Sequence, residues 1–204
     1  DDQLFIVFEF AHGGCALESF KFESQREVLS VLRQIVFALA VAEQELEFEH
    51  RDLHIGNVLV KSCEEEEVTF VLDGGKFNFP TEGVIATVID FTISRLKKDG
   101  CAVFCDISTD EGLFEGTGDI QFDVYRDMRI KNGNDWEEYH PETNVLWAKY
   151  LCTKLLTTNK VKNSRRAERH LQQHLRRLEQ ELSKYDSCTD LAFVLDFWDV
   201  LDIN

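Results

Sequence analysis

Residues 50–57 read His-Arg-Asp-Leu-His-Ile-Gly-Asn, and a second short motif, Ile-Asp-Phe-Thr, follows at residues 89–92. Phosphoryl transfer requires little covalent chemistry from a protein but strict positioning of a hydroxyl, a triphosphate and Mg²⁺. In such a site Asp52 would accept the proton of the attacking hydroxyl, Asn57 would hold Mg²⁺, and Asp90 would bridge metal and phosphate. The two motifs therefore predict the metal and acid/base half of a phosphotransferase site.

Short apolar runs rich in β-branched residues separate the two motifs. They predict strands at residues 58–60, 68–72 and 84–89, with an Asp-Gly-Gly turn at residues 73–75. Such strands would carry Asp90 back beside Asn57. A chance polar loop is the alternative to a catalytic one, but it does not account for the ordered succession of loop, strands and second motif.

Length and composition indicate a single globular domain. The chain has 204 residues, of which 44% are hydrophobic, enough to bury a sizeable core. No run approaches the roughly 20 apolar residues that span a bilayer, and the first residues lack the form of a signal peptide, so we expect no membrane partner. Six cysteines without a CxxC pair fit a reduced intracellular compartment better than a disulfide scaffold.

The net charge of −16 is unevenly distributed. Residues 106–142 carry eleven acidic side chains against three basic ones. This balance argues against direct base-specific binding of nucleic acid and favours a cationic partner. Two interpretations of the segment stay open: solvated loop charge, or an acidic groove for a basic peptide.

The pattern at the start of the chain predicts a strand and a buried helix. Residues 4–10 are almost wholly apolar, as in a buried strand, and residues 11–14 end in two glycines, as in a hinge. Ser24 and Glu27 have the spacing of a capping box, which places the start of a largely buried helix before the apolar run of residues 28–42.

The second half of the chain predicts further helices. Residues 99–135 are rich in Gly and Asp and lack clear periodicity, which predicts a long irregular segment. A helical pattern opens at residues 139–147, and residues 160–184 form an amphipathic pattern with leucines at 171, 175, 178 and 182. Residues 187–204 predict a last docked helix capped at Thr189-Asp190.

Taken together, the chain resembles the haspin family of protein kinases over essentially its full length. The matching stretches are residues 48–59, 89–95, 103–108, 121–126, 139–147 and 189–191. The resemblance implies an α+β fold, namely the mainly helical carboxy-terminal lobe of a protein-kinase-like fold with short β-hairpin strands around the catalytic loop. Within residues 1–204 it implies a last amino-lobe strand and hinge (1–16), catalytic and metal-binding loops (48–92), an atypical activation and substrate segment (93–147) and carboxy-terminal helices (148–204).

The resemblance also implies an activity and its partners. It implies an ATP- and Mg²⁺-dependent serine/threonine kinase that modifies a threonine near the N terminus of a basic histone tail (histone H3 type) in mitosis. The expected partner is therefore the histone tail on chromatin, and the expected location is the nucleus and mitotic chromosomes.

Site residues carry over from the family position by position. Asp52, His54 and Asn57 match its catalytic loop, with Asn57 and Asp90 as Mg²⁺ ligands. The residues implied for the nucleotide pocket are Phe10, Gly14, Leu59, Ile89 and Asp90.

Two positions depart from ordinary kinases. Thr92 stands in place of the glycine of Asp-Phe-Gly, and because threonine lacks glycine's freedom at positive φ we hypothesise that Asp90 flips out less readily. His54 stands where many kinases have a lysine that contacts the transferred phosphoryl group; packing within the loop is the alternative role.

Two other function classes stay open. Asp-Leu-His-x-Gly-Asn followed by Ile-Asp-Phe also occurs in small-molecule kinases of the aminoglycoside or choline type, although Arg51 and the downstream blocks favour haspin. A non-catalytic acidic module that captures a basic tail is the second alternative. The chain contains no Gly-rich phosphate loop and no strand lysine, so the amino lobe is expected to be missing and this fragment alone to be inactive.

Overall fold

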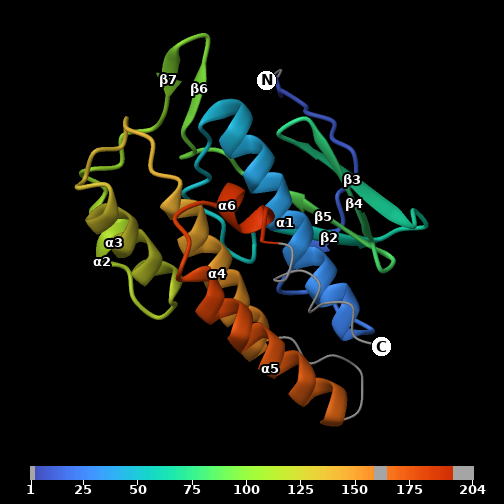
Figure 1. Cartoon of the computed structure of the whole chain (residues 1–204). Helices are drawn as coiled ribbons and strands as arrows, with labels where there is room; N and C mark the ends of the chain where they lie inside the picture. Colours follow the sequence, from blue (N-terminus) through green and yellow to red (C-terminus); the bar gives the residue numbers. More distant parts are fainter. Residues whose placement is uncertain (1–2, 159–164, 195–204) are drawn as a thin grey trace.

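The helix predicted after Ser24 runs through the middle of the fold. In the computed structural model, which describes residues 3–158 and 165–194, it is α1 (Gln25–Leu46). Ser24 Oγ accepts the main-chain N–H of Glu27 at 3.2 Å, which confirms the predicted cap. Apolar residues are buried on nearly all sides of α1, because strands cover one side and helices the other (Figure 1).

Three strands form an antiparallel sheet in the order β1-β2-β5, with β1 at Cys15–Ala16, β2 at Val58–Ser62 and β5 at Val84–Val88. Gln34 of α1 fastens this sheet to the helix. Its Nε2 donates to Val84 O at 2.9 Å, and its Oε1 accepts from Ala86 N at 2.9 Å. The predicted strands at 58–60 and 84–89 are confirmed.

Two hairpins flank the sheet. The first, β3 (Glu67–Leu72) and β4 (Gly75–Pro80), turns at the predicted Asp-Gly-Gly sequence and packs its phenylalanines on Phe37 of α1. The second, β6 (Leu96–Lys98) and β7 (Cys101–Val103), projects from the molecule beyond the end of α1 (Figure 1).

The remaining helices lie on the opposite side of α1 from β2–β5 (Figure 1). They are α2 (Glu111–Glu115), α3 (Gln121–Lys131), α4 (Glu142–Thr158), α5 (Arg165–Leu182) and α6 (Cys188–Ala192). Helix α4 confirms the predicted pattern that opens at 139–147.

The prediction of an irregular segment at 99–135 was wrong in part, because β7, α2 and α3 lie within it. Helix α3 buries only Val124, Tyr125 and Met128. Of its other apolar residues Phe122 is half-buried and Ile130 is exposed, and the remaining residues are charged or polar. Such a narrow apolar stripe gives weak periodicity in sequence.

The amphipathic prediction for α5 is confirmed, since Leu171, Leu175, Leu178 and Leu182 are all buried. Helix α6 is capped by Ser187, whose side chain accepts from Asp190 N at 2.9 Å, rather than by Thr189-Asp190 as predicted. The predicted continuation of this helix over residues 195–204 lies outside the described residues.

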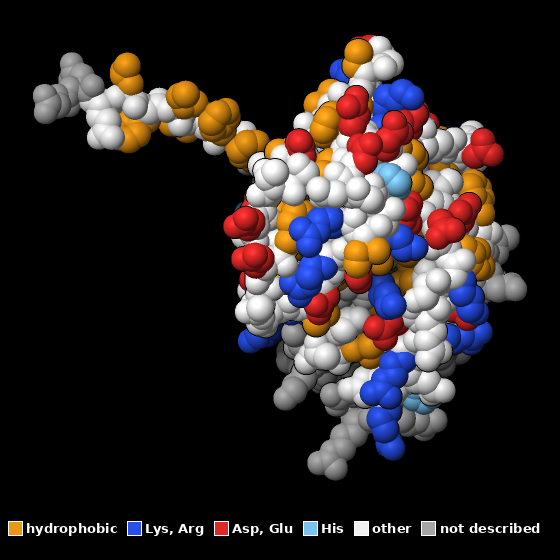
Figure 2. All heavy atoms as spheres, turned by 90° about the vertical axis from the view of Figure 1, so that its left-hand side faces the viewer, with side chains coloured by type: hydrophobic (Ala, Val, Ile, Leu, Met, Phe, Trp, Pro, Cys, Tyr) orange, Lys and Arg blue, Asp and Glu red, His pale blue; other side chains and the backbone are white. Residues whose placement is uncertain are grey.

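The prediction of a buried strand at residues 4–10 was wrong. The segment forms no strand, and its apolar side chains are exposed, from 73% at Phe8 to 94% at Leu4. Figure 2 shows this arm projecting from the body of the molecule. Among the described residues no strand lies beside it, so its backbone has no ladder partner and its side chains have no apolar surface to cover them.

The fold is thus a mixed α+β arrangement with small sheets, as expected. Within the described residues, no helix combines the length and the apolar character needed to cross a membrane.

Candidate active site

The loop of residues 50–57 joins the end of α1 to β2 and is closed by its own hydrogen bonds. Asn57 N donates to His54 O at 2.8 Å, and Asn57 Nδ2 donates to Asp52 O at 2.8 Å. Because the amide nitrogen of Asn57 is engaged in this way, its Oδ1 remains available as a ligand. The loop therefore presents Asp52 and Asn57 together, as predicted.

A buried ion pair holds the base of the loop. Arg51 has φ +67 and a fully buried guanidinium, which donates to both carboxylate oxygens of Glu49 at 3.0 and 3.1 Å and to Trp136 O at 2.7 Å. Glu49 also accepts His140 N and Thr143 Oγ1, each at 2.9 Å. The bonds to Trp136, His140 and Thr143 tie the Glu49–Arg51 pair to residues 136–143, so Arg51 acts as a structural anchor rather than as a substrate contact.

Asp90 lies beside Asn57 because β2 and β5 pair. Val58 lies opposite Val88, and Ile89 N donates to Asn57 O at 3.0 Å. The sequence prediction that the strands would bring Asp90 back to the loop is confirmed.

Thr92 holds the Asp90 side chain. Its N and Oγ1 both donate to Asp90 Oδ1, at 3.2 and 2.5 Å, and these bonds are the main cause that lowers the pKa of Asp90. Asp90 has φ +63, a conformation that costs a non-glycine residue energy and that its neighbours must maintain. The carboxylate is therefore ionised and fixed through one oxygen, while Oδ2 accepts no bond among the described residues.

The two histidines of the loop differ. His50 is fully buried, its Nε2 donates to Ile89 O at 3.1 Å, and burial lowers its pKa to about 4. His54 is part-exposed, and its Nδ1 accepts from Gly56 N at 3.0 Å. The ring proton of His54 is then on Nε2, which lies 3.9 Å from Asp52 Oδ1. His54 thus faces Asp52 and also packs the loop.

Tyr125 is a site residue that the sequence reasoning did not single out. It lies on α3, 73 positions from Asp52, and its hydroxyl donates to Asp52 Oδ1. Burial raises the pKa of Asp52, while the bond from Tyr125 lowers it. The only sequence signal was that Tyr125 belongs to one of the stretches that resemble the haspin family.

The donors at this site fit Mg²⁺. That ion prefers hard oxygen ligands and is usually bound by one or two protein side chains together with phosphate and water. Asn57 Oδ1 and Asp90 Oδ2 provide such a pair. Among the described residues no group of three or more His, Cys, Asp and Glu side chains forms a metal cluster.

Four of the five residues predicted for the nucleotide pocket lie along the three-stranded sheet. Gly14 has φ +112, and a Cβ there would lie 2.1 Å from Val60 O, so the position requires glycine. Leu59 pairs with Ala16 and Thr87, and Ile89 and Asp90 follow β5. Phe10 is not brought to this sheet: it is 83% exposed on the projecting arm and stacks only on Phe8 among the described rings.

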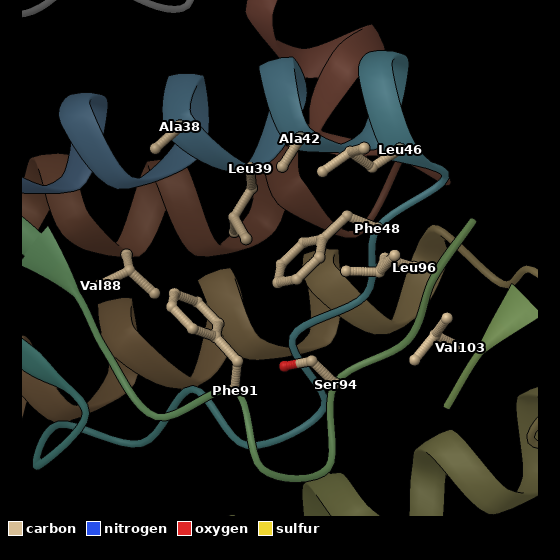
Figure 3. Close-up of a pocket in the computed structure, with 10 residues that line it drawn as sticks. All are labelled: Ala38, Leu39, Ala42, Leu46, Phe48, Val88, Phe91, Ser94, Leu96 and Val103. Atoms are coloured by element: carbon tan, nitrogen blue, oxygen red, sulfur yellow. The ribbon is translucent and has the colours of Figure 1, made fainter. Parts of the chain in front are cut away.

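An apolar cavity of about 450 Å³ lies behind the Asp90 loop. Figure 3 shows Phe48 and Phe91 pointing into it, beneath Leu39 and Leu46 of α1. Phe91 contacts the rings of Phe48 and His50 at centroid distances of 5.9 and 5.5 Å. Its lining is apolar apart from Ser94, whose hydroxyl donates to His50 O at 2.8 Å, and it holds no cationic side chain for phosphates, so this cavity is distinct from the predicted triphosphate site.

The acidic segment lies next to Asp52, because α3 belongs to it. Its exposed acids are Asp106, Asp110, Glu111, Glu115, Asp123, Asp127, Asp135, Glu137 and Glu138. Two of its three basic residues are engaged: Arg126 with Asp123 and two main-chain oxygens, and Arg129 over the Phe114 ring. On the face drawn in Figure 2, Lys and Arg side chains lie among the acidic ones.

Comparison with known proteins gives a consistent result. Residues 1–191 match the family described as haspin-like kinase domain. The chain is 48% identical to the serine/threonine-protein kinase haspin of Bos taurus, over 94% of this chain and 25% of that protein. It is 40% identical to the haspin homolog of Drosophila melanogaster (80% and 29% covered) and 38% identical to that of Arabidopsis thaliana (98% and 33% covered). The chain therefore spans between a quarter and a third of these relatives.

Proposed function

Because the chain belongs to the haspin-like kinase family, we propose that it is the hinge and carboxy-terminal lobe of an ATP-dependent serine/threonine protein kinase domain. One observation carries the proposal: β2–β5 pairing brings Asn57 and Asp90 together, and the same loop holds Asp52. A chance polar loop would not need this convergence. We use the term parent protein for a chain that joins this sequence to an amino lobe, which in this proposal completes the phosphate site.

Each residue has a distinct task in this proposal. When bound, Mg·ATP supplies the phosphoryl group and the charge that stabilises its transfer. Asp52 would orient the acceptor hydroxyl and take its proton as the hydroxyl oxygen bonds to the γ-phosphorus and the bond from that phosphorus to the leaving ADP oxygen breaks. Asn57 and Asp90 would hold the metal, and Thr92 keeps Asp90 in place.

We further propose a basic histone tail of the H3 type as substrate, modified on a threonine near its N terminus in mitosis. The exposed acids of residues 106–142 support this, because the segment that carries them contacts Asp52 through Tyr125 and its carboxylates attract a cationic peptide. The corresponding location is the nucleus, on chromosomes. The histone substrate and the mitotic role themselves come from the family resemblance.

The test uses the parent protein with Mg²⁺, labelled ATP and a histone amino-terminal peptide. We expect label on the peptide threonine, none on a peptide in which valine replaces that threonine, and none with Asp90→Ala. Label on a free amino alcohol but not on the peptide would identify a small-molecule kinase instead.

Asp52→Asn separates the enzyme from a non-catalytic acidic module. We expect this variant to lose transfer while it still binds the peptide, because the exposed acids of residues 106–142 remain. Peptide binding without transfer by the unaltered parent protein would contradict the kinase proposal.

A further inference from the structure

Tyr125 contacts the candidate catalytic aspartate directly, although it comes from a different element. Its hydroxyl donates to Asp52 Oδ1. The residue is only 2% exposed, and its ring packs edge-on against Trp147 at 5.3 Å between centroids. The phenol is therefore held firmly on the α3–α4 side of the loop.

The hydroxyl acts as the donor in this contact. Burial raises the pKa of Tyr125, and the bond to Asp52 raises it further, so the phenol keeps its proton. Asp52 is a part-buried carboxylate, and a donor at one of its oxygens fixes the rotation of the whole group.

The two oxygens of Asp52 are consequently not equivalent. Oδ1 accepts from Tyr125 and lies 3.9 Å from His54 Nε2. Oδ2 has only a long contact, 3.4 Å, with Asn57 Nδ2. Oδ2 is thus the oxygen with free capacity to accept a proton.

We propose that Tyr125 is a positioning residue for phosphoryl transfer, which holds Asp52 by Oδ1 so that Oδ2 receives the acceptor hydroxyl. This inference rests on the proposed kinase function. It adds a residue from the acidic substrate segment to the acid/base machinery, so that the placement of α3 and the orientation of Asp52 are linked.

The decisive variant is Tyr125→Phe in the parent protein, because phenylalanine keeps the ring against Trp147 and removes only the hydroxyl. Loss of this hydrogen bond to a charged group should lower kcat of Tyr125→Phe by about tenfold or more. The KM values for ATP and for the peptide should stay within about twofold of those of the parent protein. Tyr185→Phe is the matched control. It lies between α5 and α6, outside both the loop of residues 50–57 and the segment of residues 106–142, and we expect kcat within about twofold of the parent value.

A double-mutant cycle separates positioning from general loss of structure. If Tyr125 acts through Asp52, adding Tyr125→Phe to Asp52→Asn causes no further loss in single-turnover rate. An unchanged kcat in Tyr125→Phe would overturn the inference. It would also be overturned if Tyr125→Phe lowered the rate of the Asp52→Asn variant by the same factor as it lowers that of the parent protein. Absence of transfer by the unaltered parent protein would instead overturn the kinase function, and the positioning role with it.

Discussion

Asn144, at the start of α4, accepts the main-chain N–H of His50 at 3.0 Å, although 94 positions separate the two residues. The same side chain donates to Phe48 O at 2.8 Å and to Glu43 Oε1 at 2.9 Å. All these groups are buried. The Asn144 amide thus fixes the start of the loop of residues 50–57 to both α1 and α4.

Asn144→Ala is therefore expected to destabilise the fold strongly. The substitution removes the side-chain partner of the buried His50 N–H and of Phe48 O and one donor to the Glu43 carboxylate, which corresponds to a loss of about 3 kcal/mol in unfolding free energy. Denaturant unfolding of the parent protein measures it. Asn78→Ala, on the exposed β4, removes a hydrogen bond to Thr69 and should cost about 0.5 kcal/mol or less. Equal losses in the two variants would contradict the role of Asn144.

The buried Glu49–Arg51 pair gives a second prediction. Glu49→Gln keeps the shape but leaves the fully buried Arg51 guanidinium without its counter-charge, which should cost about 3 kcal/mol of unfolding free energy. Glu181→Gln is the control, because the Glu181–Lys184 pair is at the surface, and its loss should be about 0.5 kcal/mol or less. If thermal or denaturant unfolding of Glu49→Gln matched that of Glu181→Gln, the anchoring role of the pair would be wrong.

Local sequence was sufficient to predict that Asp52, Asn57 and Asp90 come together. The loop of residues 50–57, the paired strands and Asp90 are close in sequence, and their turn and strand patterns specify how they meet. Helix α1 was equally predictable, because its cap and apolar run lie within one segment.

Contacts between distant segments could not be predicted in this way. Tyr125 and Asn144 reach the loop from 73 and 94 positions away, and a lone tyrosine or asparagine carries no pattern that reveals its partner. The apolar run at residues 4–10 fits a buried strand by composition, but a strand also requires a neighbour, and sequence periodicity does not supply one.

Thr92 offers a prediction about metal binding. Thr92→Val removes the hydroxyl that donates to Asp90 Oδ1 and keeps the β-branched shape. Loss of a hydrogen bond to a metal ligand typically weakens metal affinity by about tenfold or more, so the Mg²⁺ concentration for half-maximal transfer should rise accordingly.

Thr69→Val is the control for that experiment, because it removes an exposed threonine hydroxyl of β3 that donates to Asn78 on β4 rather than to a residue of the site. We expect its Mg²⁺ dependence to match that of the unaltered parent protein. A Thr92→Val variant with an unchanged Mg²⁺ requirement would show that Asp90 does not depend on this bond.

His50 makes stability depend on pH. Burial lowers its pKa from 6.5 to about 4, whereas Asp90 favours the protonated ring and His54 opposes it. Below pH ~6.5 the unfolded chain binds a proton that the folded protein does not, so stability falls as the pH drops towards about 4 and this contribution then levels off.

The difference between the folded and unfolded pKa values of His50 corresponds to about 3 kcal/mol. We expect the difference in unfolding free energy between the unaltered protein and His50→Gln to shrink by roughly this amount between about pH 7 and pH 4, since other groups titrate in both proteins. A difference that stayed constant over that range would mean that His50 is protonated as readily in the folded state as in the unfolded chain.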